Sequence, residues 1–80
     1  MQTLSVFVCT TEEQRRIEYI QNETTSEDIC IKLCKDLNIK PSCFLLFALR
    51  IYNTSIWVPC NATKFGNSLY EFRYRYQVNF

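Results

Sequence analysis

The side chains best suited to chemistry in this sequence are its five cysteines. They are Cys9, Cys30, Cys34, Cys43 and Cys60. Zinc sites usually draw on closely spaced cysteine and histidine pairs, whereas this chain has no Cys-X-X-Cys pair and no histidine. A thiol or hydroxyl nucleophile that depends on histidine is excluded for the same reason. We therefore expect reduced thiols, no metal site and no catalytic residue.

Paired carboxylates and glycine offer the other candidate chemistries. Glu12-Glu13 falls in a predicted turn and Glu27-Asp28 at a predicted helix start, so we expect solvated and capping roles rather than acid/base catalysis. The single glycine, Gly66, cannot make a glycine-rich phosphate loop. We expect no enzymatic activity and no cofactor for this chain.

The candidate partner contacts are Arg73, Arg75 and Ile31. Both arginines lie on the polar face of a predicted strand, where they either grip a phosphate or carboxylate of a partner or are simply solvated. Ile31 lies outside the apolar stripe of the predicted helix. It is either an ordinary exposed residue or a contact to a neighbouring domain.

Charge and hydropathy narrow the partners. Nine Lys and Arg residues balance eight Asp and Glu residues, so nucleic acid is not expected as a partner. No run approaches the roughly 18 apolar residues of a membrane span, and the N-terminus lacks a basic region followed by an apolar run. We expect no direct membrane insertion.

The thiols and the asparagines point to different compartments. Reduced thiols are typical of cytosolic proteins and predict a cytoplasmic location. Asn22, Asn53 and Asn61 each begin an Asn-X-Ser/Thr sequon, which leaves a small secreted, disulfide-bonded glycoprotein as an alternative. Turns rich in Asn, Ser and Thr produce the same pattern without glycosylation.

A helix is predicted over residues 26–37. Thr25 is a good N-cap, and acidic residues follow it in the first turn, where free backbone amides favour them. An apolar stripe at helical spacing comprises Ile29, Cys30, Leu33, Cys34 and Leu37. On this stripe, free thiols act as small hydrophobes.

Strands are predicted over residues 4–9, 15–20, 44–52, 56–58 and 70–80, with a loop over 60–68. The last strand has the clearest alternation. Its apolar face is Tyr70, Phe72, Tyr74, Tyr76, Val78 and Phe80, and its solvated face is Glu71, Arg73, Arg75, Gln77 and Asn79. The order strand, strand, helix, strand, strand, loop, strand predicts an α+β, β-grasp (ubiquitin-like) fold, with a mixed five-stranded sheet and one covering helix.

Several short blocks carry a resemblance to a known family. They are TSEDICI at 25–31, IKPSC at 39–43, LFAL at 46–49, IWVPCN at 56–61 and FRYRY at 72–76. In order and spacing they resemble the first, ubiquitin-like lobe of the FERM region of the Janus kinases. The sequence departs from that family at 44–45, where His-Asn is common, and at Cys60, which takes the place of a second proline. These departures suggest a divergent member or another FERM protein.

The resemblance implies that residues 1–80 are one FERM lobe cut from a longer chain. The parent would be a non-receptor tyrosine kinase of the Janus type, which uses ATP and acts in cytokine receptor signalling through JAK-STAT. This lobe would be a non-catalytic scaffold that packs on sister FERM lobes. The whole module would hold the cytoplasmic tail of a cytokine receptor, which places the protein in the cytoplasm and at membranes through the receptor.

One further interpretation stays open. The same fold serves free-standing ubiquitin-like or Ras-association-type modules, which bind a partner by a sheet edge. The basic pair Arg15-Arg16 on the second predicted strand favours this interpretation.

Overall fold

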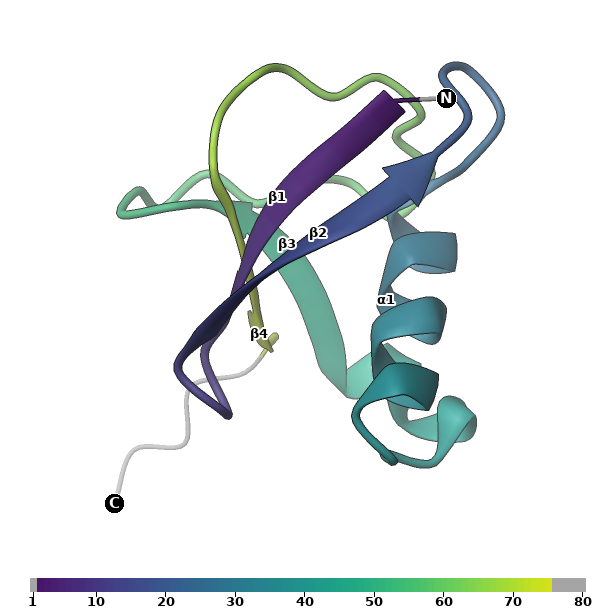
Figure 1. The fold of residues 1–80 in the computed structure, drawn as a ribbon, viewed down its shortest axis with the longest axis vertical. Helices are drawn as coiled ribbons and strands as arrows, with labels where there is room; N and C mark the ends of the chain where they lie inside the picture. Colours follow the sequence, from purple (N-terminus) through teal and green to yellow (C-terminus); the bar gives the residue numbers. More distant parts are fainter. Residues whose placement is uncertain (1, 76–80) are drawn as a thin grey trace.

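A mixed sheet covered by an α-helix makes up the part of the chain that the computed structural model describes, residues 2–75 (Figure 1). The strands are β1 (Gln2–Val8), β2 (Glu13–Tyr19), β3 (Phe47–Ile51) and β4 (Tyr70–Tyr74), and the helix is α1 (Ser26–Asp36). Their order in the sheet is β2-β1-β4-β3, with β1 and β4 parallel and the other neighbours antiparallel. This topology is consistent with the predicted ubiquitin-like β-grasp.

The β1–β2 hairpin forms because its apolar residues alternate in step. Leu4 pairs with Ile17, and both side chains are buried on the face that α1 covers. The connecting turn holds Glu12 at a φ of 55°, in the left-handed region that tight turns use. Asn22 and Asn53 also adopt positive φ, at 67° and 59°. Asparagine tolerates this backbone shape well, so the prediction that these residues are turn formers is confirmed.

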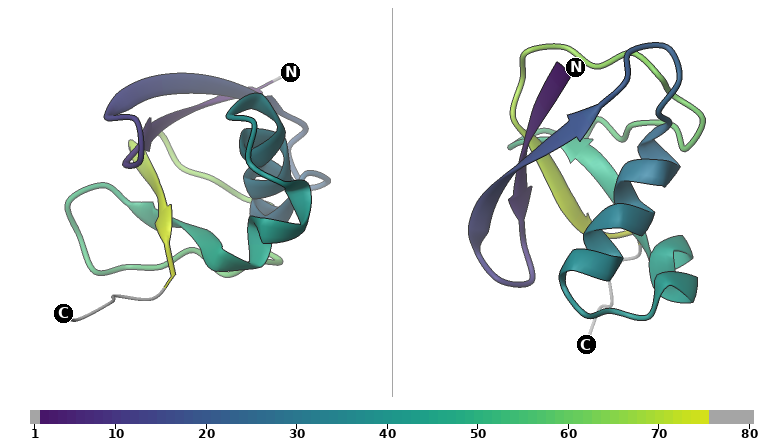
Figure 2. Two further views of the ribbon diagram at one scale, coloured as in Figure 1. Left: turned by 90° about the horizontal axis from the view of Figure 1, so that it is seen from below. Right: turned by 45° about the vertical axis from the view of Figure 1, so that its right-hand side comes forward.

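Helix α1 begins where the sequence predicts. The Thr25 hydroxyl accepts a hydrogen bond from the Asp28 N–H at 3.1 Å, and the Asp28 carboxylate accepts one from the Thr25 N–H at 3.0 Å. Such a capping box satisfies amides that the helix leaves without partners, which contributes about 1 kcal/mol. Figure 2 shows the helix lying against one face of the twisted sheet.

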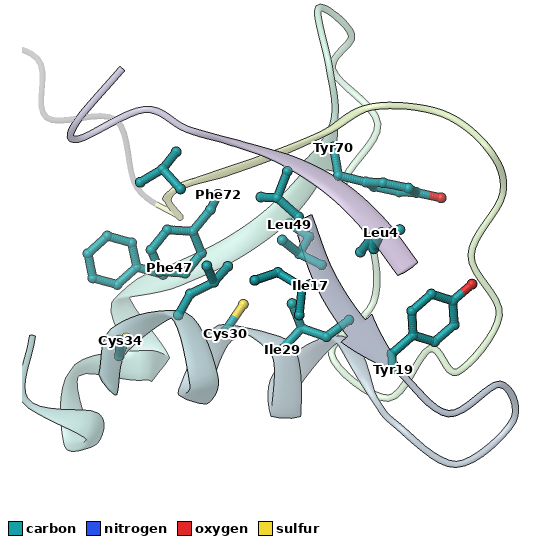
Figure 3. Packing of buried hydrophobic residues seen from close by; sticks show 13 residues of the cluster. Leu4, Ile17, Tyr19, Ile29, Cys30, Cys34, Phe47, Leu49, Tyr70 and Phe72 are labelled. Atoms are coloured by element: carbon teal, nitrogen blue, oxygen red, sulfur yellow. The ribbon is translucent and has the colours of Figure 1, made fainter. Parts of the chain in front are cut away.

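The core lies between α1 and that face (Figure 3). Leu33, Leu49 and Phe72 are among its fully buried side chains. Burial of each such side chain is worth about 1.5–3 kcal/mol. Cys30 and Cys34 are also buried and free, so the prediction that these thiols pack as core hydrophobes is confirmed.

The predicted strand over 44–52 is correct only in its second part. Residues Pro41–Leu46 form a 3-10 helix, η1, and β3 begins at Phe47. Pro41 stands in the first turn of η1, where its fixed φ suits a helix start and its missing N–H costs nothing. The apolar run looked like one buried strand, but Leu45 and Leu46 are exposed.

The predicted five-stranded sheet is wrong for the described residues, which form four strands. Residues 56–58 make only an isolated bridge, between Trp57 and Arg50 of β3. Beyond Val58 the chain leaves β3, and the Pro59 carbonyl accepts the Ser26 hydroxyl at 2.6 Å. The chain therefore turns from the sheet toward the start of α1. The predicted loop over 60–68 is confirmed.

The prediction of which side chains of the last strand are buried and which are solvated needs correction. Tyr74 is 57% exposed, because one ring face stacks on Phe47 while the rest of the ring lies in solvent. Glu71, predicted to be solvated, is only 7% exposed. Tyr70 and Phe72 are buried as predicted. The predicted strand residues 76–80 lie outside the described residues.

Between residues 2 and 75, the structure contains no helix with the length and apolar character that a membrane crossing requires.

Candidate partner-binding site

The sheet face away from α1 carries a cluster of opposite charges, here called the Glu71 cluster and made of Glu71, Arg50 and Arg73. Arg50 of β3 stands opposite Glu71 of β4 in the register, and its Nε lies 3.0 Å from Glu71 Oε1. Arg73 Nη1 lies 3.6 Å from Oε2 of the same carboxylate. A buried carboxylate is costly unless it is paired, and here both guanidinium groups compensate it. The cluster ties β3 to β4.

A thiol completes this cluster. Cys9, just after β1, donates a weak hydrogen bond from Sγ to Glu71 Oε2 at 3.8 Å. Burial raises the pKa of the Cys9 thiol, and the negative charge of Glu71 raises that pKa further. The thiol therefore stays protonated at neutral pH and has little nucleophilic character.

Trp57 extends the cluster toward the edge of the sheet. The Arg50 guanidinium carbon lies 5.3 Å from the centroid of the Trp57 ring, which is the geometry of a cation–π contact. The Trp57 backbone is held beside β3, because Val58 N–H donates to the Leu49 carbonyl at 2.9 Å and Ile51 N–H donates to the Ile56 carbonyl at 3.0 Å.

Arg75 closes the edge of β3 where this backbone pairing stops. The spacing of the hydrogen bonds would next bring the Cys60 N–H to the Phe47 carbonyl, but Pro59 diverts the chain. The Arg75 Nε donates to that carbonyl instead, at 3.2 Å. The Arg75 backbone N–H also donates to the Leu46 carbonyl, at 2.8 Å. Arg75 is thus held by its side-chain Nε to the start of β3 and by its backbone N–H to the last residue of η1.

These residues border a hollow, here called the β3-edge groove, of about 290 Å³ lined by Ala48, Trp57, Val58 and Arg75. Ala48, Val58 and Arg75 also line a smaller hollow that continues toward η1 and the start of α1. The continuation is bordered by Phe44, Leu45 and Cys60, with Glu27 on α1. The groove is therefore lined by three residues with apolar side-chain surface and by one arginine, and its continuation also carries Glu27.

A second surface lies beside the groove and is called the sheet-end patch: Leu45, Leu46 and Tyr74. Their exposed fractions are 61%, 47% and 57%. The Phe47–Tyr74 pairing and the hydrogen bond from Arg75 to Leu46 place these residues together at one end of the β3–β4 pair. Exposed apolar side chains gathered at one end of a sheet often mark an interaction surface.

The structure separates the residues that the sequence grouped as contacts. Arg73 is occupied by Glu71, whereas Arg75 borders the β3-edge groove. Ile31 is half-buried on α1 and lines neither hollow of the groove. Sequence reasoning missed Arg50, Trp57 and Glu71 as a group. These three residues are adjacent because of the β3–β4 register and the pairing of residues 56–58 with β3. The alternation of side chains along one strand does not predict which residues of other segments lie opposite it.

Other chemistry is limited in the part of the chain that the structure describes. Over residues 2–75, no three Cys, Asp or Glu side chains come together in a group that could hold a metal ion. Burial raises the pKa of Cys30 to about 12, and burial also raises the pKa of Cys34. These thiols remain neutral under ordinary conditions.

Comparison with known proteins gives a family match over nearly the whole chain. A sequence model of the FERM F1 ubiquitin-like domain matches residues 3–80. No curated protein matches the chain.

Proposed function

The chain belongs to the FERM F1 ubiquitin-like domain family, and from this premise we propose that it serves as the first lobe of a FERM module in a longer protein. F1 lobes are non-catalytic ubiquitin-like domains, so the function assigned to this chain is protein interaction. The observation that carries the proposal is the sheet-end patch. Its exposed apolar side chains suit packing against a sister lobe.

The finer assignment is a Janus-type tyrosine kinase as the parent protein. The sequence blocks at 25–31, 39–43, 46–49, 56–61 and 72–76 support it by their resemblance to that family. In this proposal residues 1–80 form one lobe, and the complete module attaches the kinase to the cytoplasmic tail of a cytokine receptor. The lobe then works in the cytoplasm and reaches the membrane only through the receptor.

Substitution of the sheet-end patch tests the lobe assignment. Leu46→Lys in the isolated chain should lower binding of the dye ANS, because a charged side chain replaces part of the apolar surface. In the parent polypeptide the same substitution should lower the midpoint of thermal unfolding, because Lys would then face a sister lobe. Ile20→Lys is the matched control, since Ile20 is 50% exposed outside the patch.

Equal effects of Leu46→Lys and Ile20→Lys on the parent polypeptide would contradict docking through this patch. The kinase assignment has a separate test in the coding sequence downstream of residue 80. Further FERM lobes and a kinase domain are expected there, and a reading frame without them would refute the Janus-type parent.

A second candidate function is a free-standing module that binds a partner along β2. One observation favours it: β2 is an edge strand of the sheet, and Arg16 on it is exposed. Extended partners can add to such an edge by backbone pairing. Binding of a folded partner by the isolated chain, lost on Arg16→Glu and kept on Leu46→Lys, would favour this candidate over the FERM lobe.

A further inference from the structure

The β3-edge groove combines apolar surface with a single positive charge. Ala48, Val58 and Trp57 supply the apolar contacts, and Arg75 supplies the charge. No acidic residue lines this hollow, and Glu27 borders only its continuation near α1. Apolar pockets with few convergent polar groups are the usual form of a binding site.

Arg75 and Arg16 are the arginines that form no ion pair with a carboxylate among residues 2–75, and Arg16 instead donates to the Thr3 hydroxyl at 3.4 Å on exposed β2. Arg15 is paired with Glu13, and Arg50 and Arg73 share Glu71. Arg75 forms no ion pair with any of the residues 2–75; its Nε holds the Phe47 carbonyl, and its terminal nitrogens bind none of their atoms. The guanidinium is therefore fixed in place with its charge uncompensated within this range.

The backbone at this end of β3 is already occupied. The Phe47 N–H donates to the Phe44 carbonyl, and the Phe47 carbonyl accepts from Arg75. A partner therefore cannot extend the sheet here by strand addition, which needs free backbone groups. It has to be held by side chains.

We propose that the β3-edge groove binds an extended peptide segment of a partner protein, with a carboxylate of the peptide on Arg75 and an adjacent apolar side chain against Ala48, Val58 and Trp57. The proposal rests on the interaction role proposed above and names the chemistry of the partner. A guanidinium is suited to a planar carboxylate. A phosphate is less well matched, because no second cation lines the groove and Glu27 borders its continuation.

Trp57 gives a direct readout, because it is the only tryptophan in the chain. The probe is a panel of acetylated, amidated peptides with a central Leu-Glu-Leu, Val-Glu-Val or Phe-Glu-Phe motif between Gly and Ser residues. Titration into the full chain at low salt should give a saturable change in Trp57 emission. Replacement of the peptide Glu by Gln should weaken binding about tenfold, because a charge-assisted hydrogen bond is lost.

Variants of the chain test which arginine is responsible. Arg75→Gln should weaken binding of the Glu peptides about tenfold and leave binding of the Gln peptides unchanged. Arg73→Gln is the matched control on the neighbouring surface and should change either affinity by less than about twofold, because Glu71 already occupies this arginine. Because Arg75→Gln also removes a contact to Phe47, the peptide exchange on the unaltered chain provides a test that does not depend on the variant's stability.

Three results would overturn the proposal. They are the absence of a saturable emission change across the whole panel, equal affinity for Glu and Gln peptides, and a Trp57 emission change that depends on protein concentration without peptide. The last result would identify a second copy of the chain as the occupant. Each of these results leaves the sheet-end patch test unaffected, so failure of the groove and failure of the lobe assignment can be told apart.

Discussion

Phe72 and Glu71 are neighbours on β4, yet their side chains enter opposite faces of the sheet. Phe72 is fully buried among apolar side chains under α1 and stacks on Phe47 at a centroid distance of 4.6 Å. Glu71 is buried on the other face, where no helix covers it, between the side chains of Arg50 and Arg73. One face is stabilised by exclusion of water and the other by compensation of charge. Burial alone therefore does not identify the core.

The largest expected effect comes from the apolar face. Phe72→Ala should lower the free energy of unfolding by about 3–5 kcal/mol, because it removes a ring and leaves a cavity. Urea denaturation followed by circular dichroism measures this loss. A loss below about 1 kcal/mol would mean that β4 does not contribute to the core as described.

The charged face should show the next largest effect. Glu71→Gln should lower the free energy of unfolding by about 2 kcal/mol, less than for a fully buried pair because Arg50 and Arg73 still reach solvent. Urea denaturation at low and high salt measures how far this difference in the free energy of unfolding depends on screening. Because the Glu71 carboxylate is buried, high salt should reduce the difference only slightly. An unchanged midpoint would show that the Glu71 cluster contributes no net stability.

Alkaline pH tests the apolar face in another way. Burial raises the pKa of Cys30 from its ordinary value of 9.0 to about 12 in the folded state, so folding favours the protonated thiol. That contribution is complete below pH 9 and is lost as the pH rises toward 12. Between these limits stability should fall by about 1.4 kcal/mol per pH unit. Cys30→Ala should show a smaller slope in chemical denaturation at pH 9 to 11, where the raised pKa values of Cys9 and Cys34 still contribute, and a slope identical to that of the wild type would refute the assignment to Cys30.

The smallest effect is expected at the end of β4. Tyr74→Ala should lower the free energy of unfolding by about 1 kcal/mol, because its ring stacks on Phe47 on one side only. Paired denaturation curves for Tyr74→Ala and Phe72→Ala measure the difference. If the two losses were equal, the core would extend past Tyr74.

The sequence predicts those parts of the fold that depend on neighbouring residues. The Thr25–Asp28 capping box, the buried Cys30 and the β1–β2 hairpin all arise from spacing within a few positions. The limit appears at Pro41–Leu46, where an apolar run suggests a strand although Leu45 and Leu46 face solvent. Local hydropathy cannot show which apolar residues another element will cover.

The candidate site was less predictable, because it is assembled from distant segments. Arg73 and Arg75 occupy equivalent positions in the alternating pattern of the last strand. Their environments differ because each guanidinium contacts a different group. Glu71 occupies Arg73, and the diversion of the chain at Pro59 leaves the Phe47 carbonyl to Arg75. Neither partner can be inferred from the spacing of the arginines. The burial of Glu71 likewise requires the β3–β4 register, which brings Arg50 opposite.

The attachment of residues 59–63 to the start of α1 has a consequence for the order of folding. The Ser26 N–H donates to the Ala62 carbonyl at 2.9 Å and the Glu27 N–H to the Cys60 carbonyl at 3.1 Å, so the first turn of the helix takes its acceptors from far downstream. During synthesis these amides lack those acceptors until the later segment has left the ribosome. The helix start should therefore mature late, with amide hydrogens at Ser26 and Glu27 that gain protection from exchange after those at Leu33.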